Sequence, residues 1–177
     1  MALKSIFRIQ LVLLSAFALS CGDDDDEGNS YSFKDQELSG EIAGDSWTYA
    51  DGFVEESTFD DESVLDISLF LAQDVPACET FGIEGDEVFF VIPNAVGLYK
   101  LSVSLNLQGR TVTLLDKDDF TNYIAGEGAI EILAITETHV IGRIDARYDG
   151  NNHVNGDFMV SFCPETGPER IQSHYKK

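Results

Sequence analysis

The chain has 177 residues, with 32 acidic side chains against 11 basic ones and a formal net charge of −21 at pH 7. A charge of this size repels phosphate backbones and anionic lipid headgroups, which argues against a nucleic-acid-binding function. The length is that of one ordinary domain with a hydrophobic core of its own.

The first 20 residues are typical of a secretory signal. Lys4 and Arg8 supply the positive start, and residues 11–19 form an apolar run of mostly small and aliphatic side chains. A membrane-spanning helix needs about 20 apolar residues, roughly twice the length of this run. Residues 1–20 are therefore predicted to be a cleaved signal peptide rather than a membrane span.

Two cleavage sites compete within the segment "LVLLSAFALSCGDDDDEGNS". Ala16 and Ala18 satisfy the A-x-A rule, and cleavage there would release a soluble chain that begins with Leu-Ser-Cys. Alternatively, residues 18–21 (Ala-Leu-Ser-Cys) resemble the lipobox of bacterial lipoproteins, with Ala18 at a position where Leu is commonest. That resemblance implies that Cys21 is acylated and becomes the first residue of a membrane-anchored chain. Two or more acyl chains would hold it stably, whereas one gives only marginal binding.

The number of cysteines favours the lipoprotein interpretation. The chain has three, and an odd count leaves one thiol unpaired in an oxidising compartment. If Cys21 carries lipid, Cys78 and Cys163 remain as an even pair, and we expect them to form a disulfide rather than two free thiols. By the chain-entropy model, closing the loop between them stabilises the fold by about 4–5 kcal/mol.

An acidic run at residues 23–27 follows Cys21 directly. These side chains cannot pack or pair with one another, so residues 21–36 are predicted to be a solvated tether. The run also resembles the surface-export signal of lipoproteins from Bacteroidota, which implies an outer-membrane protein displayed at the cell surface; the periplasmic face is the alternative. The mature chain of 157 residues would carry nine basic and 32 acidic side chains, a net charge of −23.

Apolar and polar residues alternate with a period of two through most of the remaining chain, and no segment has the pattern of an amphipathic helix. We expect a β-domain over residues 37–164, followed by a polar tail over residues 165–177. Strands are predicted at residues 38–42, 46–53, 65–71, 88–93, 99–107, 111–115, 140–148 and 158–162.

Turn-forming sequences separate these strands. "AGDS" at residues 43–46, "LQGRT" at 107–111 and "YDGNNHVNG" at 148–156 are rich in Gly, Asn and Asp. The predicted fold class is all-β: a single domain of about nine strands, built as an antiparallel β-sandwich or a small β-barrel.

Three longer segments add a second resemblance. The chain contains "GEIAGDSWTYADG", then "IPNAVGLYKLS", then "GEGAIEILAITETHVIGRIDARYDGNNHVNGDFMVSF". In this order they resemble the small uncharacterised β-rich lipoproteins of Bacteroidota. The shared motifs are structural, so the resemblance implies a β-rich extracytoplasmic domain and assigns no catalytic residue.

Catalytic patterns are missing from the sequence. His139, His153 and His174 lack the spacing of a zinc site, and no nucleophile elbow or phosphate-binding loop occurs. Acidic residues are too abundant for any pair of them to indicate a glycosidase. We therefore expect a protein that is not an enzyme and has no cofactor.

Calcium is the best metal hypothesis, although a weak one. Asp149, Asn151, Asn155 and Asp157 cluster within "DGNNHVNGD", and their side chains carry the oxygen ligands that Ca²⁺ prefers. The cluster does not match an EF-hand loop. A turn stabilised by Asp and Asn side chains explains the same residues without a metal.

Aromatic residues supply the remaining candidate contacts. Trp47, Tyr49 and Phe53 alternate along one predicted strand, where they could stack on a glycan or a peptide, or pack in the core. The expected function is a membrane-anchored extracytoplasmic lipoprotein with a non-enzymatic β-domain that binds an extracellular protein or glycan, or supports the envelope. The alternative is a calycin-like barrel that holds a small hydrophobic ligand and has Trp47 in its pocket.

Overall fold

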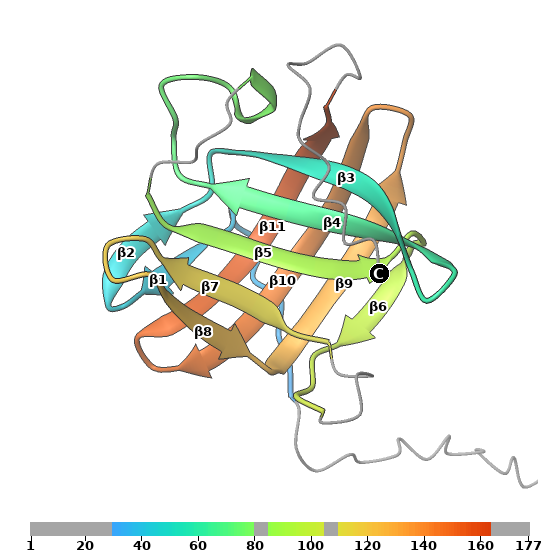
Figure 1. Ribbon diagram of the computed structural model, residues 1–177. Coiled ribbons are helices and arrows are strands. Elements are labelled where there is room, and N and C mark those ends of the chain that lie inside the picture. Colours follow the sequence, from blue (N-terminus) through green and yellow to red (C-terminus); the bar gives the residue numbers. More distant parts are fainter. Residues whose placement is uncertain (1–29, 80–84, 105–109, 164–177) are drawn as a thin grey trace, which may run out of the picture.

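The computed structural model describes residues 30–79, 85–104 and 110–163 (Figure 1). The predicted signal peptide, Cys21, the acidic run, the turn at residues 107–109 and the C-terminal tail lie outside these residues. The strands begin at Ser39 and end at Phe162. This interval falls within the predicted β-domain.

Eleven strands and one short 3₁₀ helix make up the described chain. The only described helix, η1, comprises Ala77–Glu79. The strands are β1 (Ser39–Ile42), β2 (Asp45–Thr48), β3 (Asp51–Phe59), β4 (Glu62–Phe70), β5 (Glu87–Pro93), β6 (Gly97–Lys100), β7 (Val112–Asp116), β8 (Thr121–Ala125), β9 (Glu127–Ile135), β10 (His139–Asp149) and β11 (Asn152–Phe162).

All strands belong to one curled sheet that forms a half-barrel. Nine of them follow the order β6-β9-β10-β11-β3-β4-β5-β7-β8, and the β1–β2 hairpin attaches to β11. Every pairing between strands is antiparallel except the short parallel contact of β11 with β3. In Figure 1, β3, β4, β5 and β7 cross in front of β11, β10 and β9, and β6 lies beside β9. The all-β prediction is therefore confirmed, and the sheet combines the curl of a barrel with the two layers of a sandwich.

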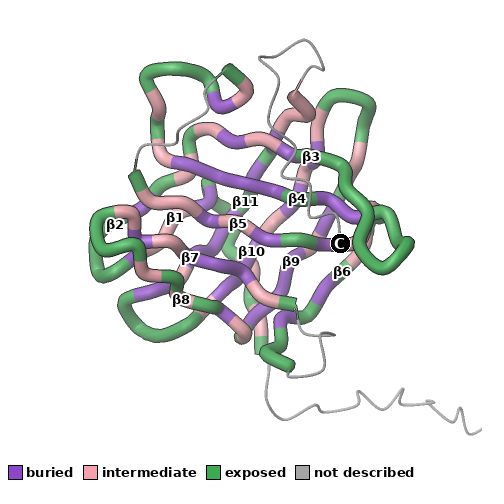
Figure 2. The backbone as a smooth tube through the Cα atoms, in the orientation of Figure 1, coloured by how far each residue is buried: buried purple, intermediate pink, exposed green. Residues whose placement is uncertain are grey.

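The core fills the space between the two layers. Alternate residues of each strand point inward, so that Leu65, Ile67 and Leu69 of β4 are fully buried (Figure 2). Phe90 of the front layer meets Phe158 of the back layer edge-on, with ring centroids 6.0 Å apart. Aliphatic and aromatic side chains thus form one continuous core between the layers.

Two hairpins use positive backbone φ angles at their turns. Ala43 and Gly44, between β1 and β2, have φ values of 54° and 86°. This turn lies inside the predicted 43–46 segment, so that prediction is confirmed. Asp60 and Asp61, between β3 and β4, have φ values of 48° and 65°, which Asp tolerates better than most residues.

The predicted turn over residues 148–156 is too long. Only Gly150 and Asn151 separate β10 from β11, and Asn155-Gly156 lies within β11. Gly156 has a φ of 141°, and a Cβ atom there would lie 2.7 Å from the backbone oxygens of Gln36 and Glu37. Glycine is therefore needed because another segment crosses the strand, not because the chain turns.

Two strand predictions need correction. Strand β6 ends at Lys100, and among the described residues up to 104 the predicted strand over residues 99–107 continues only as an isolated bridge between Ser102 and Arg110; residues 105–107 lie outside the described chain. Alternation along residues 140–148 predicts a buried Tyr148, yet this residue is 53% exposed, because the register of β10 with β11 shifts between Arg147 and Asp149.

Candidate functional site

The segment from Ser30 to Leu38, which we call the strap, runs beside β10 and β11 and ends at Leu38, which is buried in the core. The backbone N–H of Ser32 donates to Asp145 Oδ2 at 2.8 Å, and that of Lys34 donates to Asn155 Oδ1 at 2.8 Å. Asn155 Nδ2 donates in return to the Ser32 carbonyl at 2.9 Å. Residues 30–36, which the sequence assigned to the tether, are therefore part of the folded domain.

A buried charge holds the first part of the strap. The Asp145 side chain is only 2% exposed and forms an ion pair with Arg147, with 2.6 Å between Oδ2 and Nη1. Arg147 also donates through Nη2 to the carbonyl of Ser30. A buried carboxylate needs a partner of opposite charge and hydrogen bonds to offset its lost hydration. Arg147 and the Ser32 amide meet both needs.

Aromatic stacking and backbone bonds hold the rest of the strap. The Arg143 guanidinium lies 4.5 Å from the ring centroid of Phe33 and pairs with Glu131 at 2.6 Å. Further along, the Asp157 amide donates to the Gln36 carbonyl at 2.8 Å, and the Leu38 amide donates to the Asp157 carbonyl at 3.0 Å. The strap therefore joins the sheet through contacts along most of its length.

A hollow of about 260 Å³ lies beside the strap, lined by Ser32, Lys34, Asp145, Arg147, His153 and Asn155. Three of its lining side chains, those of Asp145, Arg147 and Asn155, already have partners within the chain. Throughout the described residues, every buried side-chain nitrogen or oxygen makes a hydrogen bond. The hollow is thus better suited to fixing the strap than to binding a ligand.

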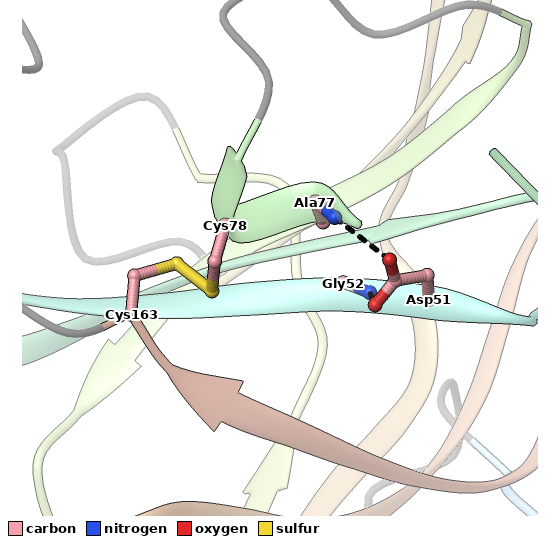
Figure 3. The surroundings of a disulfide bond; sticks show 5 residues. All are labelled: Asp51, Gly52, Ala77, Cys78 and Cys163. Carbon is pink, nitrogen blue, oxygen red and sulfur yellow. Dashed lines mark hydrogen bonds between the residues drawn. A yellow bond between two sulfur atoms is a disulfide. The ribbon is translucent and has the colours of Figure 1, made fainter. Parts of the chain in front are cut away.

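The disulfide lies at the other end of β11 (Figure 3). Cys163 follows the last residue of β11 and is bonded to Cys78 in η1, with 5.2 Å between the Cα atoms. Asp51 supports the same region, because its Oδ2 accepts the Ala77 amide and its Oδ1 accepts the Gly52 amide, both at 2.7 Å. We call residues 71–79 the cap. The cap lies over the start of β3, and its residue Ala77 is buried.

The three predicted contact aromatics do not form one surface. Trp47 is 1% exposed and donates Nε1–H to the Asp86 carbonyl at 3.1 Å, so it is a core residue. Tyr49 follows β2, is half-buried and donates its hydroxyl to the Met159 carbonyl. Phe53 lies on β3, where it packs against Phe70 at 5.7 Å. A break between β2 and β3 separates what the sequence predicted as one strand.

The weak calcium candidates also serve other contacts. Asp149 Oδ1 accepts the Asn151 amide and Asn152 Nδ2, both at 2.9 Å, which confirms the turn interpretation for this residue. These hydrogen bonds lower the pKa of Asp149 below its ordinary value. Asn155 holds the strap, and Asp157 joins it through backbone bonds. In the described part of the chain, no three His, Cys, Asp or Glu residues are placed to hold a metal ion.

Two carboxyl groups have a raised pKa, but they do not face each other. Burial is the main cause for both; the charge of Glu55 adds to it at Asp66, and that of Asp66 at Glu87. In the β4–β5 register Asp66 is opposite Val91 and Glu87 is opposite Phe70. Four residues of strand, about 13 Å, therefore separate the two positions, too far for a shared proton.

The residues that hold the strap have no distinctive sequence signal. Asp145 and Arg147 occupy outward positions of β10, where a charged side chain is ordinary. The most useful clue is Gly156, because a glycine inside a strand often marks a place where another backbone comes close. The sequence therefore contains a signal for the strap, but the predicted turn gave this glycine a different role.

No helix in the described residues is long and apolar enough to span a membrane. No protein-family model matches the chain, and no curated protein or solved structure matches it either.

Proposed function

We propose that the protein is a lipid-anchored extracytoplasmic protein whose β-domain is a non-catalytic binding or envelope-support module. The supporting sequence features are the lipobox-like segment ending at Cys21, the acidic run behind it, and the resemblance to β-rich lipoproteins of Bacteroidota. On the same grounds we place it at the outer membrane, facing the cell surface.

The strap is the structural observation that best supports an anchored domain. Here Asp145, Arg147 and Asn155 bond to the backbone within five residues of Ser30. A pull on the tether would therefore be transmitted to β10 and β11, in the middle of the back layer, rather than to an isolated strand end.

The packed interior favours a module that binds at its surface over the hydrophobic-ligand barrel. Trp47, which the barrel hypothesis placed in the pocket, is surrounded by core residues, and Phe90 and Phe158 meet across the layers. A second hollow, of about 200 Å³, opens outward between β5 and β7 beside Phe89 and Arg110. Sites for small apolar molecules usually enclose about 300–1,000 Å³.

The intact mass of protein purified from native membranes tests the anchor. We expect a chain that starts at Cys21 with added acyl mass and gains two hydrogens on reduction of the disulfide. Cys21→Ser should move the protein to the soluble fraction, while the matched control Ser20→Ala should stay with the membranes. An unlipidated mass that starts at Leu19 would overturn the proposal.

A further inference from the structure

The first residue of the strap, Ser30, and the disulfide lie at opposite ends of the molecule. Arg147, which binds Ser30, is the register partner of His153 near the start of β11, and Cys163 follows its end. Ten residues of extended strand separate His153 from Cys163, a distance of about 33 Å. Figure 1 agrees, because the chain enters at the bottom of the view, while β11 ends at the top.

The greatest reach of the tether is about equal to this distance. Nine residue steps separate Cys21 from Ser30. Even a fully extended chain spans at most about 3.6 Å per step, or roughly 32 Å in total. If Cys21 is held in the lipid surface, the cap could approach that surface only with the tether fully stretched along the side of the domain.

The end that the tether enters also carries exposed apolar side chains. Tyr148, next to Arg147, is 53% exposed, and its ring contacts Tyr123 of β8 at 5.6 Å. Val103 is 70% exposed and lies against Gly126, the residue between β8 and β9. Tyrosine is enriched where proteins meet the lipid–water boundary, because its ring is apolar and its hydroxyl is polar.

We propose that the end of the half-barrel bearing Tyr148 and Val103 rests on the lipid surface, which leaves the disulfide-linked cap pointing away from the membrane. This orientation rests on the proposed lipid anchor. The hydrogen bonds of the strap to Asp145, Arg147 and Asn155 determine this orientation. They keep residues 30–36 folded against the sheet, so these residues cannot add to the length of the tether. Partners outside the membrane would then meet the cap end first.

The orientation can be measured without native lipidation. With the disulfide oxidised, Cys21 is the one remaining thiol of the mature chain, so it can be coupled to a maleimide lipid in zwitterionic vesicles. Tyr148→Trp places a fluorophore at the tether end, and Val75→Trp, at a 45% exposed cap residue, is the matched control. The native Trp47 is buried in the core and contributes the same background to both variants.

Lipids brominated on their acyl chains quench tryptophan on contact and report which end touches the bilayer. We expect quenching in the Tyr148→Trp variant to exceed that in the Val75→Trp variant by about threefold, because tether length limits the reach of the cap end. Equal quenching, or greater quenching at the cap, would overturn the orientation. Failure to find acyl chains on native protein would instead overturn the anchor and leave this result standing.

A lengthened tether tests whether the strap and tether set the orientation. Eight Gly and Ser residues inserted between Asn29 and Ser30 add up to about 28 Å of reach without altering any folded residue. We expect the difference in quenching between the two ends to fall at least about twofold as the domain gains freedom. An undiminished difference would contradict the role given to the tether.

Discussion

The two ends of strand β11 hold peptide segments against the sheet by different means. At the tether end the strap is held by the ion pair of the buried Asp145 with the partly exposed Arg147 and by amide hydrogen bonds to Asp145 and Asn155. At the cap end a covalent bond joins Cys78 to Cys163, and Asp51 orients the cap backbone. The tether end depends on every polar group keeping its partner, whereas the cap end depends on one redox-sensitive bond. Perturbing each end separately should therefore give separable effects.

Removal of the disulfide should have the largest effect. The bond closes a loop of 85 residues, so Cys78→Ser combined with Cys163→Ser should lower the free energy of unfolding by about 4 kcal/mol. Urea unfolding of the variant and of the reduced parent protein measures this loss. A loss below about 1 kcal/mol would mean that the cap stabilises the fold mainly through Asp51 and packing.

Breaking the ion pair should have the next largest effect. Asp145→Ala leaves the partly exposed Arg147 without its partner and the Ser32 amide without its acceptor, which should cost about 2 kcal/mol in urea unfolding. Asp145→Asn keeps an oxygen acceptor for the Ser32 amide and should cost about half as much. If both variants are as stable as the parent, the strap contributes nothing to the fold.

Tyr49 lies between the two ends and should have the smallest effect, confined to high pH. Burial, with smaller contributions from the charges of Asp51 and Glu37, raises the pKa of Tyr49 to about 12 from 10.0. The folded state therefore retains this proton more tightly than the unfolded state, so stability is complete below pH 10 and falls as the pH rises toward 12. Because the side chain is partly exposed, the loss should be about 1–2 kcal/mol.

Tyr49→Phe is the variant that isolates this contribution. The substitution removes the ionisable hydroxyl and should flatten the fall in stability between pH 10 and 12, as followed by thermal unfolding. It also removes the hydrogen bond to the Met159 carbonyl, so a uniform loss of about 1 kcal/mol is expected at neutral pH. If stability falls equally steeply with pH in the variant and in the parent protein, groups other than Tyr49 cause the loss at alkaline pH.

Alternation along the chain was sufficient to predict the fold class and the first hairpin. Inward residues of β4, β5 and β10 form the core as their period of two predicts, and the Ala43-Gly44 turn occurs where expected. Local pattern could not predict the exposure of Tyr148, because a register shift changes which face a residue occupies. It also placed β6 too far along the chain, since β6 ends at Lys100.

The strap could not be predicted from local sequence because its partners are more than a hundred residues away. Ser32 and Asp145 are separated by 113 positions, and Lys34 and Asn155 by 121. Asn155-Gly156 has the composition of a turn, yet both residues serve the strap. Asn155 accepts a hydrogen bond from the Lys34 backbone amide, and Gly156 lacks the Cβ atom that would collide with the strap backbone. The cysteine pair was easier to predict, because counting cysteines needs no knowledge of the fold.

Amide hydrogen exchange at Ser32 and Lys34 in the mature chain is the most direct test that the strap belongs to the domain. Both amides donate to buried side-chain acceptors. We expect them to exchange at least about a thousandfold more slowly than in an unstructured peptide, close to the amides of β10. Exchange at the rate of a free peptide would contradict the account, because the tether would then extend to the first strand.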